Sequence, residues 1–173
     1  MTKKKFIKNI VLIGFMGSGK SMAAKALSDK LKAKSFSTDD LIEAKQKRSI
    51  AKIIEHKGWD YFRELEHKEV KKLSSKKGVI IDCGGGVVLN PNNMKFLKAN
   101  GIIFYLKASP KVIYNRLKGD KTRPLISSSN PQAKIKEILK TRIPLYNQAD
   151  FTVDASDPSI DVPVAEILKK LSL

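Results

Sequence analysis

GFMGSGKS (residues 14–21) follows directly on the apolar run at residues 10–13 and leads into a helical pattern of apolar side chains. Its spacing is that of a phosphate-binding loop, G-x-x-x-x-G-K-[ST], set between a strand and a helix as this motif requires. The glycines allow a tight turn whose N–H groups face inward, and the helix N-terminus adds a positive end. The chain is therefore predicted to bind a nucleoside triphosphate.

Two residues of the loop have specific expected roles. Lys20 is expected to reach the β- and γ-phosphates of ATP, and the Ser21 hydroxyl is expected to hold Mg²⁺. The predicted ATP-binding residues of this segment are Gly14, Gly17, Ser18, Gly19, Lys20, Ser21 and Met22. An ordinary glycine-rich turn before a helix is the alternative, but such a turn does not require the full eight-residue pattern.

Length and composition indicate one globular domain. A chain of 173 residues is long enough for one hydrophobic core, and its 42% hydrophobic and 29% charged residues are typical of a soluble protein. No apolar run approaches the roughly 20 residues of a membrane-spanning helix, so no membrane partner is expected. The lone cysteine, Cys83, excludes a disulfide framework and fits a reducing cytoplasm. We expect a cytoplasmic monomer.

The formal net charge of +17 comes from 34 Lys and Arg residues against 17 Asp and Glu residues. One interpretation is a nucleic acid or another anionic partner. The other is a lysine-rich composition spread over solvated faces. The second is favoured because the lysines occur along the whole chain and no aromatic RNA-binding motif accompanies them. The positive field would still help attract ATP and an anionic substrate.

Strand-like and helix-like segments alternate along the chain. The predicted strands span residues 10–13, 79–82, 102–106 and 151–153, with a further short one ending at Phe36. Between them, apolar residues recur at the i, i+3, i+4 spacing of helices, with a break expected at Gly58 and an end or kink at Pro144. This alternation predicts an α/β fold with a parallel sheet and helices on both faces.

Four features lie where predicted strands end. They are the phosphate-binding loop, the pair Asp39-Asp40, Asp82 with the glycines that follow it, and the loop after Leu106. In parallel sheets, ligands bind beyond the carboxyl ends of the strands. The sequence therefore predicts one binding site built from all four.

Five further motifs follow the phosphate-binding loop. They are Thr38-Asp39, Phe62-Arg63, Gly84-Gly85-Gly86, Arg123-Pro124-Leu125 and Arg142-Ile143-Pro144-Leu145-Tyr146. In this order and at this spacing, the six motifs resemble the shikimate kinase family. The resemblance implies the three-layer α/β/α fold of P-loop nucleoside-triphosphate hydrolases, with five parallel strands as in nucleoside monophosphate kinases. It also implies a single domain over residues 1–173, with a substrate-binding segment near 39–66 and a lid near 117–131.

The activity that the resemblance implies is phosphorylation of the shikimate 3-hydroxyl, with ATP and Mg²⁺, on the route to chorismate and aromatic amino acids. Arg63 and Arg142 match the family's carboxylate-binding arginines, and a planar guanidinium suits a carboxylate. Asp39 matches the aspartate that binds and orients the acceptor hydroxyl. Glu66, one helical turn after Arg63, is expected to hold that arginine in place. The triple glycine, Gly84, Gly85 and Gly86, is expected to let the backbone and its N–H groups approach the ring.

For the nucleotide, Arg123 matches the lid arginine that closes over the phosphates and stabilises transition-state charge. Arg116 matches the position that stacks on adenine, although an exposed arginine with no ligand is the alternative. Pro158 is expected on the opposite face of that slot. The predicted catalytic residues are Lys20, Asp39 and Arg123.

One position departs from the family pattern. The family usually has an aspartate two residues before the position of Asp39, on the magnesium side, and this chain has Ser37 there. Asp40 is shifted by one place, which in an extended segment turns a side chain to the other face. Asp82 ends an apolar strand, as does the Walker B aspartate of P-loop enzymes. The hypothesis is therefore a magnesium site at Ser21 and Asp82.

Two other functions compete with this prediction. A related small-molecule kinase, such as a gluconate kinase, would use the same phosphate machinery, but the two arginines and the triple glycine argue against it. An ATP-binding protein with weakened catalysis, such as a basic regulatory or nucleic-acid-binding module, is supported only by Ser37 and the net charge.

Overall fold

The computed structural model describes residues 8–120 and 129–172. At its centre is a parallel sheet in the order β2-β3-β1-β4-β5. The strands are β1 (Asn9–Ile13), β2 (Ser35–Ser37), β3 (Ile80–Asp82), β4 (Gly101–Lys107) and β5 (Phe151–Asp154). The five-stranded parallel sheet of the predicted α/β fold is confirmed.

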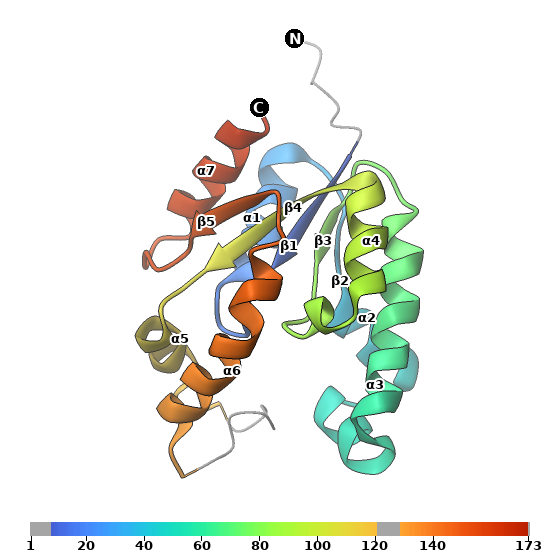
Figure 1. Cartoon of the computed structure of the whole chain (residues 1–173). Coiled ribbons are helices and arrows are strands. Elements are labelled where there is room, and N and C mark those ends of the chain that lie inside the picture. Colours follow the sequence, from blue (N-terminus) through green and yellow to red (C-terminus); the bar gives the residue numbers. More distant parts are fainter. Residues whose placement is uncertain (1–7, 121–128, 173) are drawn as a thin grey trace.

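Helices cover both faces of the sheet, as Figure 1 shows. One face packs against α1 (Lys20–Leu31) and α7 (Asp161–Lys170). The other packs against α3 (Ile50–Ser74), the short 3₁₀ helix η1 (Val87–Leu89), α4 (Pro91–Asn100), α5 (Pro110–Leu117) and α6 (Pro131–Tyr146). Alternate residues of the buried strands enter the two cores, because successive side chains of a strand point to opposite faces. Neither these helices nor any other in the described ranges is long and apolar enough to cross a membrane.

A third, smaller core joins α2 (Thr38–Gln46) to the first half of α3. It is formed by Ile42, Ile53 and Phe62, all of them buried. The predicted break at Gly58 is confirmed: its backbone is non-helical (φ 81°, ψ 172°), and the helix resumes beyond it. The turn at Gly58 brings the start of α3 against α2, so this small core lies apart from the sheet.

One local prediction is wrong, and one of the two alternatives expected at Pro144 is excluded. The Asp39-Asp40 segment is not extended but forms the first turn of α2, where the Ser37 hydroxyl accepts a hydrogen bond from the Asp40 N–H (3.1 Å). The missed signal is the pattern S-x-x-D, which is typical of a helix N-terminus. Pro144 does not end α6, which continues to Tyr146. The proline removes one helical hydrogen bond, that to the carbonyl oxygen four residues earlier, but α6 continues through it for two more residues.

Candidate functional site

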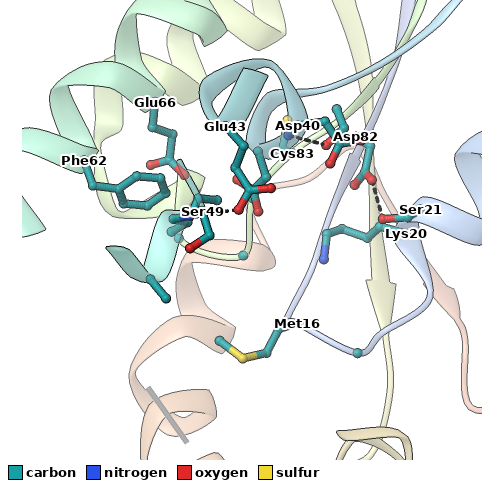
Figure 2. A pocket seen from close by; sticks show the side chains of 18 of the residues that line it. Met16, Lys20, Ser21, Asp40, Glu43, Ser49, Phe62, Glu66, Asp82 and Cys83 are labelled. Carbon is teal, nitrogen blue, oxygen red and sulfur yellow. Dashed lines mark hydrogen bonds between the residues drawn. The ribbon is translucent and has the colours of Figure 1, made fainter. Parts of the chain in front are cut away.

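The carboxyl ends of the central strands open onto a pocket of about 850 Å³. Figure 2 shows Lys20, Ser21 and Asp82 on one side of it, and Phe62 and Glu66 on the other. The predicted site residues that line this pocket are Gly17, Gly19, Lys20, Ser21, Met22, Asp39, Arg63, Glu66, Asp82, Gly84, Gly85, Gly86, Arg116 and Arg142. The fold thus brings the phosphate-binding loop and both predicted carboxylate-binding arginines to one cavity.

The phosphate-binding loop wraps around the N-terminus of α1. Gly17 has a left-handed backbone (φ 74°), which favours glycine. Lys20 Nζ donates a hydrogen bond to the Phe15 carbonyl oxygen (2.9 Å), so the lysine folds back along the loop. Ser18 is fully buried, and neither it nor Gly14 is among the residues that line the pocket. Lys20 is therefore the cation that this loop offers to a phosphate.

The predicted adenine side lies at the outer edge of the pocket. Arg116 donates hydrogen bonds to the carbonyl oxygens of Gly17 (3.4 Å) and Asp157 (3.0 Å). It thereby connects the phosphate-binding loop to the segment after β5. Pro158, next to Asp157, is exposed. Arg123 lies outside the described residues, as does most of the predicted lid.

The candidate metal residues touch each other at the start of α1. Ser21 Oγ donates a hydrogen bond to Asp82 Oδ2 (2.6 Å). Asp82 is buried at the end of β3 and pairs in register with Ser37 of β2. In a parallel pair, residues in register have side chains on the same face. A hydroxyl and a carboxylate are hard oxygen donors, so this pair fits Mg²⁺.

Asp40 lies near this pair. Burial raises the pKa of Asp82, and the Asp40 carboxylate adds to this rise. The charge of Lys20 and the hydrogen bond from Ser21 oppose it. Asp40 also lines the pocket, on the first turn of α2. The structure therefore gives no reason to exclude Asp40 from the metal site on the ground that its segment is extended. Asp40 is nevertheless exposed, whereas Asp82 has the direct bond to Ser21.

On the opposite wall, Arg63 is fixed by its neighbours on α3. Arg63 Nη1 donates to Glu66 Oε2 (2.8 Å), and its guanidinium carbon lies 5.2 Å from the Trp59 ring centre and 5.0 Å from that of Phe62. Glu66 is almost fully buried, and its Oε1 accepts no hydrogen bond from the residues that the structure describes. Glu66 thus holds the arginine with one oxygen, while its other oxygen is buried without a hydrogen-bond partner among the described residues.

Burial raises the pKa of Glu66 to about 7, although the charge and hydrogen bond of Arg63 oppose the rise. The folded state therefore holds a proton that the unfolded state releases from about pH 4.5 upward, and stability falls between that pH and about pH 7. Across this interval the free energy of unfolding should fall in the parent but not in Glu66→Gln. The difference between the two chains should therefore shift by up to about 3 kcal/mol in favour of the variant. Urea unfolding of both chains at about pH 5 and about pH 8 measures it. An equal pH dependence in both chains would contradict this prediction.

The three glycines after β3 lie against different parts of the site. An added Cβ would come within 2.5 Å of Asp39 Oδ1 at Gly84, and within 3.2 Å of a backbone nitrogen of the phosphate-binding loop at Gly85. At Gly86 it would collide with the guanidinium of Arg63. The Gly84 N–H donates to Thr38 Oγ1 (2.9 Å). Within the described residues, the N–H groups of Gly85 and Gly86 have no such partner, and both glycines line the pocket.

Gly86→Ala tests the contact with Arg63. The backbone of Gly86 (φ −100°, ψ 3°) is open to alanine, so the added methyl acts through the displaced arginine. We expect the KM for the acceptor to rise about 10- to 100-fold, because a charge-assisted hydrogen bond is lost, while the KM for ATP changes less than about threefold. Steady-state kinetics with each substrate varied measures both. Equal changes in the two KM values would contradict the assignment of Arg63 to the acceptor.

Two residues to which the sequence motifs gave no role of their own support the site. Thr38 is fully buried and ties α2 to the glycine run through Gly84, although the two residues are 46 positions apart. Tyr146 is also fully buried, and its hydroxyl donates to the Gly85 carbonyl oxygen. Both belong to motifs quoted above, but only packing between distant segments reveals what they contact.

Comparisons with known proteins agree on one family. The family model described as "Shikimate kinase" matches residues 16–172. Shikimate kinase of Caldanaerobacter subterraneus subsp. tengcongensis is 43% identical, covering 94% of this chain and 95% of the relative. That of Thermodesulfovibrio yellowstonii is 42% identical, covering 95% of each chain.

Solved structures give the same result. Shikimate kinase from Acinetobacter baumannii, in complex with shikimate, matches with a TM-score of 0.93 at 32% identity, covering 97% of this chain and 95% of that one. A gluconokinase from Sinorhizobium meliloti matches with a TM-score of 0.60 at 16% identity, covering 98% of each chain. The second similarity concerns the fold alone.

Proposed function

The chain belongs to the shikimate kinase family, and on that premise we propose that it transfers the γ-phosphoryl group of ATP to the 3-hydroxyl of shikimate. The products are 3-phosphoshikimate and ADP. One observation carries the proposal: Lys20 of the phosphate-binding loop lines the same pocket as Arg63 and Arg142. A phosphate donor and a carboxylate-bearing acceptor therefore have their binding groups in one cavity. Family membership also supports a role on the route to chorismate and aromatic amino acids, in the cytoplasm.

The acceptor would bind by its carboxylate and its hydroxyl groups. Arg63 and Arg142 would bind the carboxylate, since each presents a guanidinium to the pocket. The N–H groups of Gly85 and Gly86 would contact the ring or its substituents. Glu66 would act on the acceptor through Arg63, which it holds by a hydrogen bond at the pocket wall.

Asp39 would orient the nucleophile. Its side chain lies beside Gly84 on the pocket wall, at the start of α2. As the acceptor hydroxyl oxygen bonds to the γ-phosphorus, the bond from that phosphorus to the β–γ bridging oxygen breaks, and the hydroxyl proton passes to Asp39. Because the phosphoryl transition state needs little covalent help from the protein, positioning and charge stabilisation supply most of the rate.

Lys20 would stabilise the charge that develops on the transferred group and on the leaving ADP. Ser21 and Asp82 would hold Mg²⁺, which when bound neutralises charge on the β- and γ-phosphates. Arg116 and Pro158 would flank the adenine, and Arg123 would close over the phosphates as part of a lid near residues 117–131. Residues 39–66 would serve as the acceptor-binding segment of a single domain spanning residues 1–173.

A coupled assay of ADP release tests the proposal. The purified chain is supplied with ATP and Mg²⁺ and with shikimate, gluconate or no acceptor, and the phosphorylated product is identified by mass spectrometry. We expect ADP release that depends on shikimate and yields one monophosphate. A gluconate-dependent rate equal to the shikimate rate, or release that no acceptor stimulates, would overturn the assignment.

A further inference from the structure

The carbonyl oxygen of Gly85 accepts two hydrogen bonds from α6. One comes from the Tyr146 hydroxyl (2.5 Å) and the other from Arg142 Nη1 (3.1 Å). The two donors are four residues apart, so they lie on the same side of the helix. Arg142 is the residue assigned above to the acceptor carboxylate, whereas Tyr146 has no role in the chemistry described so far.

The direction of this carbonyl fixes the direction of an N–H group. In a planar trans peptide, the C=O of one residue and the N–H of the next point opposite ways. Because the Gly85 carbonyl points at α6, the Gly86 N–H points away from α6. Gly86 lines the pocket, and the described part of the chain gives its N–H no partner. The hydrogen bonds from α6 therefore fix the direction of the Gly86 N–H, a donor beside the pocket.

Both donors are buried, but they differ in what else they can bind. The Tyr146 ring is fully buried and stacks on Tyr105 of β4, with ring centres 4.9 Å apart and planes 22° apart. Burial raises the pKa of Tyr146 to about 12, so its hydroxyl keeps its proton at neutral pH. Arg142 is held at the pocket wall and is the group that an acceptor carboxylate would compete for. If a carboxylate drew Arg142 away from Gly85, the hydroxyl of Tyr146 would be the donor left on that carbonyl.

We propose that Tyr146 is a positioning residue of the acceptor site: its hydroxyl keeps the Gly85–Gly86 peptide turned so that the Gly86 N–H faces the acceptor while Arg142 binds the carboxylate. This rests on the proposed function, because it assumes a carboxylate-bearing acceptor in this pocket. The alternative is that the Tyr146 ring only fills the core. The two differ in which kinetic constant responds when the hydroxyl alone is removed.

Tyr146→Phe removes the hydroxyl and keeps the stacked ring. Tyr105→Phe is the matched control, since it removes a buried hydroxyl from the same ring pair and has no bond to Gly85. We expect Tyr146→Phe to raise the KM and the dissociation constant for shikimate about 5- to 20-fold, and to change the KM for ATP less than about twofold. Tyr105→Phe is expected to change neither. Binding is followed directly through Trp59, the sole tryptophan, which lines the pocket.

Four outcomes would count against the positioning role. An unchanged shikimate constant in Tyr146→Phe overturns the positioning role. So does an equal loss in the constants for shikimate and ATP, or an equal loss in Tyr105→Phe, because a core-filling residue has no preference for one substrate. If the unmodified chain shows no shikimate-dependent ADP release, the proposed function itself fails, and the positioning role fails with it. Thermal melting of each variant confirms that the kinetics are measured on folded protein.

Discussion

Asp39→Asn is expected to lower kcat for phosphoryl transfer to shikimate by about 10²- to 10⁴-fold. Asparagine keeps the size of the side chain but cannot take the proton of the attacking hydroxyl. The side chain lies beside Gly84 and near the buried Glu66, so an amide of the same size should occupy the same place. Since Asp39 is on the acceptor side of the pocket, the affinity for ATP should change less than about threefold.

Single-turnover measurement of product formation, at saturating ATP, gives the rate of the chemical step directly. The affinity for ATP is measured separately by calorimetry, which shows that the variant retains its nucleotide site. A kcat within about threefold of the parent would remove Asp39 from the mechanism. A large rise in the KM for ATP with unchanged kcat would instead assign Asp39 to the nucleotide.

Asp82→Asn is expected to raise the Mg²⁺ concentration for half-maximal activity about 10- to 100-fold. The side chain accepts the hydrogen bond of Ser21 in the structure, and an amide there carries no charge to hold the cation. A second readout does not depend on turnover: the Mg²⁺ dependence of ADP binding, measured by calorimetry, should weaken in parallel. Asp40→Asn is the matched control, because Asp40 lies near Asp82 but has no bond to Ser21.

The register of the sheet supplies a rescue experiment. Ser37 of β2 is paired with Asp82 of β3, so Ser37→Asp combined with Asp82→Asn moves the carboxylate to the neighbouring strand. Aspartate is as good a helix N-cap as serine, so α2 should keep its start. We expect the double variant to regain at least about tenfold in apparent Mg²⁺ affinity over Asp82→Asn. The exchange of the carboxylate between strands would be contradicted if the Mg²⁺ affinity did not recover. It would also be contradicted if the recovered affinity depended entirely on Asp40.

Most of the fold could be predicted from short stretches of sequence. The residue types that mark a buried strand or the phosphate-binding loop lie within a few residues of one another. β1 and α1 illustrate this: an apolar run, three glycines and a lysine occur in one continuous segment. Where a local signal was present but overlooked, as in the S-x-x-D start of α2, the prediction was wrong at that point. Because of this error, Asp40 was not expected among the residues that line the pocket.

The rest of the site depends on contacts between segments that no local pattern records. The hydrogen bond from Gly84 to Thr38 joins residues 46 positions apart, and that from Tyr146 to Gly85 joins residues 61 apart. The sequence placed these residues in motifs but could not say which atoms meet. The different neighbour of each glycine is likewise a result of packing, since three identical residues in a row carry no distinguishing signal.

The small core of Ile42, Ile53 and Phe62 shares no buried residue with the two cores that flank the sheet. The helices that it joins also contribute Asp39 and Arg63 to the pocket. Two of the acceptor-side residues are therefore positioned by a packing unit of their own, although the later part of α3 joins the main core through Val70 and Leu73. Evolution, or a protein engineer, could repack this small core and so shift Asp39 and Arg63 to suit a new alcohol, while the phosphate-binding loop before α1 stays in place.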